Sequence, residues 1–487
     1  MNTDQQSVFN SLRSAIDTGD SASHKLFFLD APGGTGKTFV FNSILAYARS
    51  LKKISLALAS SGISAILLSG GRTGHSRFKI PLSVLSDTNL KIAKNSKLGQ
   101  LLCRADLIIW DEAPMQSKNV LNCVDRLLKN LLGSTNDRGV HECNPQPFGG
   151  KLFIFGGDFR QNTPVIPKQN RAGIVSQLIS KSYWWDSTVK MHLSINERIL
   201  RQQASTEENE SFSEFLMDVG NGTIPYIPEL GTNTIRIPEE YVFESPDLSS
   251  FVDWCFPNLE RNADNIGDKA ILTPLNKDAH ILNDIALHKM NGNEVTFKSI
   301  DSVLCEDSSS ELVNYPVEYL NTLSLSGFPE HILKFKIGCP LILLRNLNPS
   351  LGLCNGTRLK LIDVTSRILT CSIINGSHLG STTYIPRIDL INADGVLPFS
   401  LKRRQFPVRL AFAMTINKAQ GQSLSQVGVF LPRPVFSHGQ LYVALSRSGN
   451  KAKTKLFICD VNGEQGRFRD RPGVYTKNVV YHEALSR

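Results

Sequence analysis

Four short apolar runs in the first third of the chain each end in polar residues. They are "HKLFFLDA" (24–31), "ISLALAS" (54–60), "ADLIIWDEAPM" (105–115) and "KLFIFGGDFRQNTPV" (151–165). Short apolar runs of this kind are typical of strands buried in a parallel sheet. After the first run, Val40, Ile44 and Leu45 recur at helical spacing. The pattern predicts alternating strands and helices over about the first 165 residues, which is an α/β fold.

The first predicted strand leads into the glycine-rich stretch "APGGTGKT" (31–38). A strand, a glycine loop and a helix in this order are the context of a phosphate-binding loop, here with alanine in place of the first glycine. Glycines let the backbone approach phosphates closely, and the amides at the helix start point at the anion. We expect Lys37 to contact the β- and γ-phosphates and the Thr38 hydroxyl to bind Mg²⁺. The expected nucleotide contacts of this loop are Pro32, Gly33, Gly34, Thr35, Gly36, Lys37 and Thr38.

Two later strands place polar side chains at the sheet edge where open α/β folds bind ligands. We expect Asp111 to hold Mg²⁺ and Glu112 to be the base that orients or deprotonates the attacking water. Gln161, taken alone, indicates only a polar turn, but it could also reach the γ-phosphate or its water. Because three strand ends converge on one place, the sequence predicts hydrolysis of a nucleoside triphosphate.

Composition narrows the class of protein only a little. Lys plus Arg number 53 and Asp plus Glu 44, which gives a net charge of +9 and a pI near 9.0. This surplus fits a polyanionic partner and a plain basic surface equally well. The nine cysteines form no C-x-x-C pair, so no zinc site is indicated, and free thiols in a reducing compartment are expected. No apolar run approaches the 18 residues of a membrane span.

The last fifth of the chain contains a second set of phosphate-type motifs. "LAFAMTINKAQGQSL" (410–424) is an apolar strand that ends in a polar turn rich in glutamine and glycine. "FSHGQLYVALSRSGN" (436–450) has a helical pattern with Arg447 at its end. A single arginine there is usually a solvated charge. A second half that handles phosphate would, however, need such a cation for the transition state.

Together these stretches resemble DNA helicases of the petite-integration-frequency (PIF) family of superfamily 1B, most closely the subgroup of Helitron rolling-circle transposons. The similar stretches follow the family order from about residue 2 to 447. They include "NTDQQSVFN", "APGGTGKT", "LASSGISAILLSGGRTGHSRFKIPL", "LIIWDEAPM", "FGGDFRQ", "LSINER", "AILTPLNKDAHILND", "RRQFPVRLAFAMTINKAQGQSL" and "LYVALSR".

The resemblance implies an α/β fold of two RecA-like P-loop motor domains. A small wedge insert interrupts the first domain and an SH3-like β-barrel insert the second, where short strands punctuated by Gly, Asn and Pro occur. The expected boundaries are 1–182 for the first domain with its wedge at about 69–98, 183–299 and 401–487 for the second domain, and 300–400 for the β insert. We also expect an exposed acidic turn at "STEENESF" (205–212) and a loop at 258–268.

The resemblance also implies roles for single residues. Gln5 matches a glutamine that recognises adenine, Gln161 the γ-phosphate sensor, and Gly421 a position at the γ-phosphate. Arg198 and Arg447 match the two arginines that the second motor domain contributes. The segments that contact single-stranded DNA in the family contain Ser60, Ser61, Gly62, Thr73, His75, Thr415, Asn417 and Lys418.

Two positions depart from the family pattern. Glu197 stands where the family usually has methionine, and Gly74 where it usually has alanine. A glutamate beside Arg198 could pair with that arginine and weaken its action. A glycine at position 74 could loosen the DNA loop.

The implied activity is an ATP- and Mg²⁺-dependent DNA helicase that moves 5′→3′ on single-stranded DNA and unwinds duplex. Repair, recombination, telomere maintenance or rolling-circle transposon replication would be its setting. Expected partners are single-stranded and tailed duplex DNA, without a membrane, for a monomeric motor in the nucleus or the mitochondrion. An upstream replication-initiator domain in the natural gene is also expected. Two alternatives stay open: an ATP-switched DNA-binding remnant of a transposon helicase that does not unwind, and a P-loop enzyme such as a small-molecule kinase.

Overall fold

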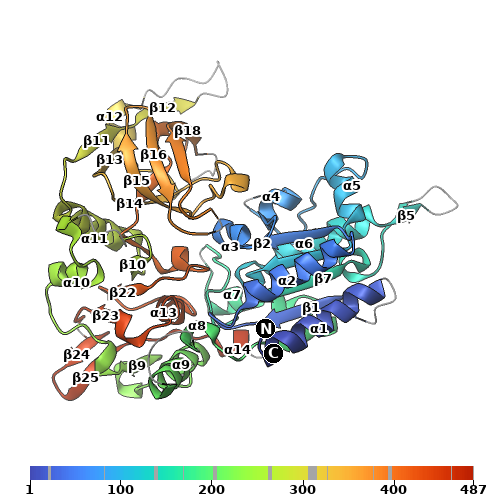
Figure 1. Ribbon diagram of the computed structural model, residues 1–487, viewed down its shortest axis with the longest axis horizontal. Helices are drawn as coiled ribbons and strands as arrows, with labels where there is room; N and C mark the ends of the chain where they lie inside the picture. Colours follow the sequence, from blue (N-terminus) through green and yellow to red (C-terminus); the bar gives the residue numbers. More distant parts are fainter. Residues whose placement is uncertain are drawn as a thin grey trace. The chain divides into compact units, whose positions relative to one another are not determined.

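The computed structural model describes the chain except residues 20–23, 82, 136–140, 168, 201–205, 262–265, 305–314, 326, 377, 393–396, 462 and 486–487. The chain forms two compact units (Figure 1). The first comprises Met1–Phe243 and Ala419–Arg487, and the second comprises Glu244–Lys418. Below, the two are called the first and the second unit. The predicted domain boundaries at 182, 299 and 400 fall at other places in the chain than the limits of these units, and they stay predictions.

The first unit is built on a six-stranded, fully parallel sheet with the strand order β3-β2-β4-β7-β1-β8. The four strands predicted from the apolar runs are β1, β2, β4 and β7, so that prediction is confirmed. Because all strands run the same way, their carboxyl ends share one edge of the sheet. The strands are β1 (Leu26–Asp30), β2 (Ser55–Ala59), β3 (Arg72–Thr73), β4 (Leu107–Asp111), β7 (Leu152–Gly157) and β8 (Val189–His192).

Both faces of this sheet are buried, as expected for parallel strands with near-continuous apolar sequences. Phe153 and Phe155 pack with Trp184 on one face, whereas Ile154 packs with α2 residues such as Ile44 on the other. The predicted helix after the glycine loop is α2. The helices of the first unit are α1 (Thr3–Thr18), α2 (Lys37–Ser50), α3 (Gly62–Leu67), α4 (Gly74–Phe78), α5 (Lys97–Arg104), α6 (Lys118–Leu131), α7 (Arg171–Ser176), α8 (Glu197–Leu200), α9 (Thr206–Asn221), α13 (Gln440–Leu445) and α14 (His482–Leu485).

Smaller sheets complete the first unit. β24, β25 and β9 form an antiparallel sheet, β22 runs parallel to β23, and β5 pairs with β6. These strands are β5 (Ser134–Thr135), β6 (His141–Glu142), β9 (Thr234–Ile237), β22 (Gln426–Leu431), β23 (Thr454–Ile458), β24 (Gly466–Phe468) and β25 (Arg471–Lys477).

The acidic turn predicted at 205–212 is wrong over residues 206–212, because helix α9 begins at Thr206. Residue 205 lies outside the described residues. The reason is the apolar pattern just after the acidic run. The rings of Phe212 and Phe215 pack on Tyr241, with centroid distances of 5.9 and 4.7 Å, so the buried side of the helix fixes its acidic first turns as well. Of the loop predicted at 258–268, residues 262–265 lie outside the described part of the chain.

Within its described residues, the second unit combines the α-helices α10, α11 and α12 with mostly antiparallel strands (Figure 1). β10 and β21 are parallel, a five-stranded sheet has the order β17-β16-β15-β14-β20, and β12-β19-β18 and β11-β13 are smaller sheets. The predicted short strands between 300 and 400 are present. The elements are α10 (Leu248–Cys255), α11 (Asn276–Lys289), α12 (Val317–Thr322), β10 (Lys269–Thr273), β11 (Val295–Lys298), β12 (Ile300–Leu304), β13 (Ile332–Phe335), β14 (Pro340–Leu343), β15 (Arg358–Val364), β16 (Ile368–Ile373), β17 (Thr382–Pro386), β18 (Ile388–Ile391), β19 (Ser400–Gln405), β20 (Val408–Leu410) and β21 (Ala413–Thr415).

Two expectations from composition concern the whole chain. Eight cysteines fall within the described residues and all are free thiols, while Cys305 lies outside them. Within the same described ranges, no helix is long and apolar enough to cross a bilayer.

Candidate nucleotide and nucleic-acid sites

The glycine loop joins β1 to α2 at the carboxyl edge of the parallel sheet. Gly34 and Gly36 have φ values of 99° and 86°, in the region that favours glycine. A Cβ atom on Gly34 would lie 2.4 Å from the Asn196 Oδ1 atom, and one on Gly36 would lie 2.5 Å from the Gln5 Nε2 atom. The loop therefore needs glycine for its backbone and for the close approach of two neighbouring segments.

Lys37 contacts both predicted carboxylates. Its ammonium group forms an ion pair with Asp111 and lies 3.4 Å from the Glu112 Oε1 atom. Burial alone would lower the pKa of Lys37, but the two carboxylates outweigh burial and raise that pKa. Burial raises the pKa of Glu112, although the charge of Lys37 opposes the rise. Lys37 thus stays a cation, and Glu112 has the higher proton affinity that a general base needs.

The backbone at Glu112 is unusual. Its φ and ψ angles are 52° and 38°, which is the left-handed region in a residue that is not glycine. Such a conformation costs about 1–3 kcal/mol and persists only where neighbouring groups hold it. The Ser60 hydroxyl donates to the Glu112 carbonyl oxygen at 2.6 Å, and the Glu112 amide donates to the Asp111 carboxylate at 2.8 Å. The backbone of the predicted base is therefore fixed from both sides.

The predicted nucleotide residues surround one cavity of about 900 Å³ in the first unit. Thr35 is buried beside it, and its carbonyl accepts a hydrogen bond from the Gln5 side chain at 3.0 Å. Asp111 forms an ion pair with Lys37, which lines the cavity. The predicted residues that line the cavity itself are Gln5, Pro32, Gly33, Gly34, Gly36, Lys37, Thr38, Glu112, Gln161, Arg198, Gly421 and Arg447.

The two predicted arginines meet at this cavity. Arg198 donates to the Ser446 carbonyl at 2.8 Å, and Arg447 donates to the Val443 carbonyl and the Ser446 hydroxyl, both at 2.8 Å. Burial, followed by the charge of Arg447, lowers the pKa of Arg198 to about 10. Burial also lowers the pKa of Arg447. Two desolvated guanidinium groups that repel one another are well suited to bind an anion such as a phosphate.

Gln161 and Glu197 complete the predicted set around the cavity. The Gln161 side chain is 4% exposed, and its amide nitrogen lies 3.4 Å from Asp158 Oδ2. Among the described residues its carbonyl oxygen has no hydrogen-bond partner, so it can accept a bond from a water in the cavity. Glu197, one of the two departures from the family pattern, accepts a hydrogen bond from Asn2 at 2.8 Å.

A buried polar cluster beneath the glycine loop was missed in the sequence. The Tyr442 hydroxyl donates to Asp158 at 2.9 Å and accepts from the Gly33 amide at 3.4 Å. Arg160 pairs with the same Asp158 carboxylate at 3.0 Å and lies 3.5 Å from Asp30. Asp158 and Arg160 belong to the stretch "FGGDFRQ" and Tyr442 to "LYVALSR", but nothing in the sequence indicates that the two stretches contact one another.

The predicted DNA contacts of the first unit lie at the starts of two short helices. Ser61 caps α3 by accepting from the Ser64 amide at 3.1 Å, and Thr73 caps α4 by accepting from the Ser76 amide at 3.3 Å. Ser60 and Gly62 flank the first of these caps. His75 lies in α4, and burial lowers its pKa, so its ring is neutral at neutral pH. A neutral ring of this kind can stack on a base.

The remaining predicted DNA contacts belong to the second unit. Thr415 ends β21, and Asn417 and Lys418 follow in a short 3₁₀ helix, Ile416–Ala419. Thr415 and Lys418 line a cavity of about 880 Å³. Burial, followed by the charge of Arg409, lowers the pKa of Lys418 to about 8.

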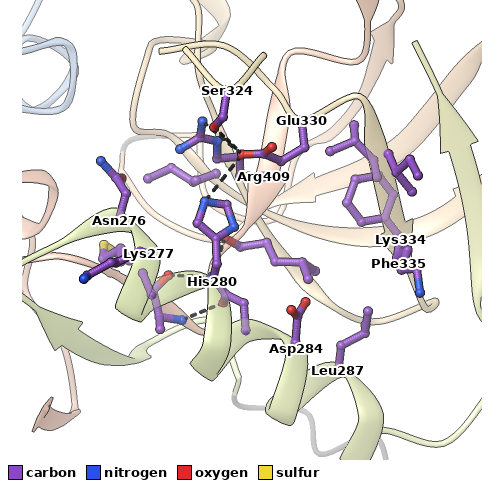
Figure 2. A pocket seen from close by; sticks show the side chains of 18 of the residues that line it. Asn276, Lys277, His280, Asp284, Leu287, Ser324, Glu330, Lys334, Phe335 and Arg409 are labelled. Carbon is purple, nitrogen blue, oxygen red and sulfur yellow. Dashed lines mark hydrogen bonds and ion pairs between the residues drawn. The ribbon is translucent and has the colours of Figure 1, made fainter. Parts of the chain in front are cut away.

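Figure 2 shows a cluster in this second cavity that the sequence did not single out. Glu330 lies 3.7 Å from the Arg409 guanidinium and 3.5 Å from the His280 Nε2 atom, and the Ser324 hydroxyl donates to it at 3.3 Å. His280 belongs to α11 and to the similar stretch "AILTPLNKDAHILND", which was the only signal available for it.

Comparisons with known proteins agree on one group. A family model described as PIF1-like helicase matches residues 1–229, and one described as DNA helicase Pif1, 2B domain, matches residues 318–364; together they cover more than half of the chain. The chain is 28% identical over 449 residues to the ATP-dependent DNA helicase Pif1 of Campylobacter jejuni, covering 88% of each protein. It is 26% identical over 428 residues to the ATP-dependent DNA helicase PIF1 of Danio rerio, covering 88% of this chain but 57% of that protein.

A solved structure is similar over almost the whole chain. The Pif1 helicase from Bacteroides, in complex with ADP-AlF3 and single-stranded DNA, superposes with a TM-score of 0.64 at 22% identity. The match covers 94% of this chain and 93% of that one. At this identity the similarity establishes the fold: an α/β protein with two RecA-like domains and a 2B domain.

Proposed function

Because the chain belongs to the Pif1 family of helicases, we propose that it is an ATP-dependent DNA helicase that requires Mg²⁺ and moves 5′→3′ along single-stranded DNA. One observation supports the proposal most directly. A single cavity of about 900 Å³ is lined by Lys37 of the phosphate loop, Glu112, Gln161 and the two arginines Arg198 and Arg447. A P-loop enzyme that only binds nucleotide has no need of both a general base and two arginines at the same cavity.

The roles of the residues follow from their positions. The amides of the glycine loop and Lys37 would bind the β- and γ-phosphates. Glu112, with its raised pKa, would take the proton of the attacking water, and the free carbonyl oxygen of Gln161 would help to orient that water. Arg198 and Arg447 would stabilise the charge that develops on the transferred phosphoryl group. Gln5, which also lines the cavity, would contact the adenine.

The residues present fit a magnesium ion. Thr38 lines the cavity and Asp111 contacts Lys37 beside it, which supplies a hydroxyl and a carboxylate oxygen. Mg²⁺ is usually held by one or two such oxygens together with phosphates and water. When bound, the ion would offset the negative charge of the phosphates.

The DNA would be held by Ser60, Ser61, Gly62, Thr73 and His75 in the first unit, and by Thr415, Asn417 and Lys418 in the second. These residues suit contacts with the sugar-phosphate backbone of DNA and with a stacked base. Binding of this kind has little sequence preference. We propose that the protein binds single-stranded and tailed duplex DNA as a monomeric motor. We also propose a nuclear location, with mitochondria as the second choice, and a role in repair, recombination, telomere maintenance or rolling-circle transposon replication.

The central experiment compares unwinding of duplexes that carry a 5′ tail, a 3′ tail or no tail, with ATP and Mg²⁺ present. We expect unwinding of the 5′-tailed duplex only, and no unwinding by Glu112→Gln. Unwinding restricted to 3′ tails would contradict the direction of movement. ATP hydrolysis that DNA stimulates, without unwinding of any substrate, would instead favour the DNA-binding remnant. ATP hydrolysis that DNA never stimulates would contradict the proposal as a whole.

A further inference from the structure

Trp110 is the last apolar residue of β4, directly before Asp111 and Glu112, and it is completely buried. Helix α4 packs on the indole ring of Trp110. Thr73 is the N-cap of this helix, and His75 lies within it. The Phe78 ring stacks on the indole at a centroid distance of 6.0 Å and an angle of 9°. A Cβ atom on Gly74 would lie 2.3 Å from the indole atoms Cη2 and Cζ2. Glycine at position 74 is therefore required by the tryptophan, which explains this departure from the family pattern.

The polar edge of the same indole leads to the predicted base. The Trp110 Nε1 atom donates to the Ser60 hydroxyl at 3.1 Å, and this hydroxyl donates its own proton to the Glu112 carbonyl at 2.6 Å. The Ser60 amide donates to the Asp111 carbonyl at 3.1 Å. A serine hydroxyl has one proton to donate and can accept, so both bonds form at once. They hold the left-handed backbone of Glu112 in place.

We propose that Trp110 is a positioning residue that couples DNA at α4 to hydrolysis at Glu112. The inference rests on the proposed function, in which Thr73 and His75 contact DNA. A base stacked on His75 moves or orders α4, and α4 contacts the indole through Gly74 and Phe78. Because the indole is close-packed and hydrogen-bonded to Ser60, a shift of α4 changes the position of the Glu112 backbone. DNA therefore raises kcat for ATP more than it changes KM.

A purely structural role for Trp110 predicts a different outcome, and Trp184 supplies the matched control. Trp184 is also buried in the first unit, stacks on Phe155 at 5.0 Å, and donates its indole proton to Asn122 at 3.1 Å. Trp184→Phe and Trp110→Phe both remove one buried indole hydrogen bond from the same core. Only Trp110 lies between α4 and Glu112.

The experiment measures ATP turnover of the wild-type chain, Trp110→Phe and Trp184→Phe without DNA and at saturating single-stranded oligonucleotide. The affinity of a labelled oligonucleotide is measured separately by fluorescence anisotropy. We expect Trp110→Phe to bind the oligonucleotide as wild type does, while its stimulation by DNA falls by about 2- to 30-fold, the range observed for residues along a coupling route. Trp184→Phe should keep the wild-type stimulation. Equal stimulation in Trp110→Phe and Trp184→Phe overturns the inference.

Tryptophan emission gives a second measurement that loss of stability alone does not mimic. The chain has four tryptophans, so removing one leaves a measurable signal. Addition of unlabelled oligonucleotide should change the emission of wild type and of Trp184→Phe, and this change should be absent in Trp110→Phe. An unchanged DNA-dependent signal in Trp110→Phe contradicts the coupling.

Gly74→Ala tests the same contact from the side of α4, and its stimulation by DNA can be measured whether or not Trp110→Phe folds. The added methyl group meets the six-membered ring of the indole, which phenylalanine lacks at that place. Gly74→Ala should lower the stimulation by DNA, and it should lower Tm more in wild type than in the Trp110→Phe background. Equal Tm losses overturn the proposed contact. If the wild type binds no DNA at all, the proposed function fails together with the inference. If the wild type binds DNA and both Trp110→Phe and Gly74→Ala keep the normal stimulation, the inference alone is overturned.

Discussion

Single residues around the nucleotide cavity combine deep burial with charge. Glu112 is 6% exposed and Arg447 is 3% exposed, although charged side chains are seldom so deeply buried without partners. The burial of Glu112 is tolerated because Lys37 contacts both Asp111 and Glu112. The burial of Arg447 is tolerated because its guanidinium group donates hydrogen bonds to a backbone carbonyl and a hydroxyl. Replacing any one of them would remove a proposed function and would also leave a partner unpaired, so each variant needs a check of its stability.

Glu112→Gln should bind ATP but hydrolyse it at least about 10²-fold more slowly, because the amide fills the same space and cannot take a proton. Steady-state turnover and the affinity of a fluorescent ATP analogue test this together. Glu483→Gln, which alters an exposed ion pair with Arg171, is the control and should leave both unchanged. Normal turnover in Glu112→Gln would show that another group is the base.

Arg447→Ala should lower kcat by about 10³-fold with a smaller change in KM, since a cation of this kind acts mainly on the transition state. Arg198→Ala should act in the same direction. Arg467→Ala removes an exposed partner of Glu239 and serves as the control. An Arg447→Ala protein with raised KM and unchanged kcat would assign this arginine to ground-state binding instead.

At this scale the sequence predicted which residues would be present at the site, because phosphate chemistry restricts the choice of side chains and their spacing. It did not predict their mutual contacts. The bond from Gln5 to the Thr35 carbonyl, and the bond from Tyr442 to Asp158, join residues 30 and 284 positions apart. Such pairs depend on how complete elements pack, and a single sequence holds no record of that packing.

Among the elements, the short helix α13 shows how an N-cap residue can fix the position of a helix. Its N-cap, Gly439, has a φ of 73°, and a Cβ atom there would lie 2.3 Å from the Arg160 carbonyl. The preceding residue, His438, lies 2.7 Å from the Phe159 carbonyl and accepts from the Tyr481 amide. Helix α13, which precedes Arg447, thus packs directly on the loop that contains Gln161.

Gly439→Ala should therefore destabilise the protein by at least about 1–3 kcal/mol, from left-handed strain plus overlap with backbone. Its ATP turnover should fall as well, because α13 positions Arg447 relative to Gln161. Denaturant unfolding and steady-state kinetics test the two effects. Gly463→Ala has a similar φ of 72° with open space around it, so it isolates the strain from the overlap.

The elements were predicted well where apolar runs are buried on both faces, as in β1, β4 and β7. The prediction failed at α9 because the acidic residues of its first turns conceal the apolar spacing that follows them. Gly74 shows a further limit, since the reason for this glycine is a tryptophan that lies 36 residues later and contacts it only in the folded chain.

On the scale of the whole molecule, the DNA contacts that we propose belong to both units. The second unit would contribute Lys418, whose pKa of about 8 is lowered by burial and by Arg409. The ammonium group is therefore charged below about pH 8 and loses its charge as the pH rises through that value. In an unfolded chain the same group stays charged to higher pH. Lys418 thus makes the folded state more stable, relative to the unfolded state, as pH increases from about 8 towards 10.5.

Affinity for single-stranded DNA should accordingly fall between pH 7 and pH 9 in wild type and fall less in Lys418→Ala. If Lys418 contacts one phosphate, Lys418→Ala should also reduce the slope of log affinity against log salt by about 0.7. Lys289→Ala, which loses a pair with Asp253 away from the cavity, is the control. Identical pH and salt profiles for wild type and Lys418→Ala would remove this lysine from the DNA contacts.

The residues that line the nucleotide cavity are far apart in the sequence, from Gln5 to Arg447. During translation the phosphate loop is synthesised roughly four hundred codons before that arginine. A polypeptide that stops early, through a premature stop codon or a stalled ribosome, would still contain the loop, Lys37 and Glu112 but would lack the last cation of the site. Because Arg447 lines the cavity, products that end before it should hydrolyse ATP far more slowly than a chain that contains it.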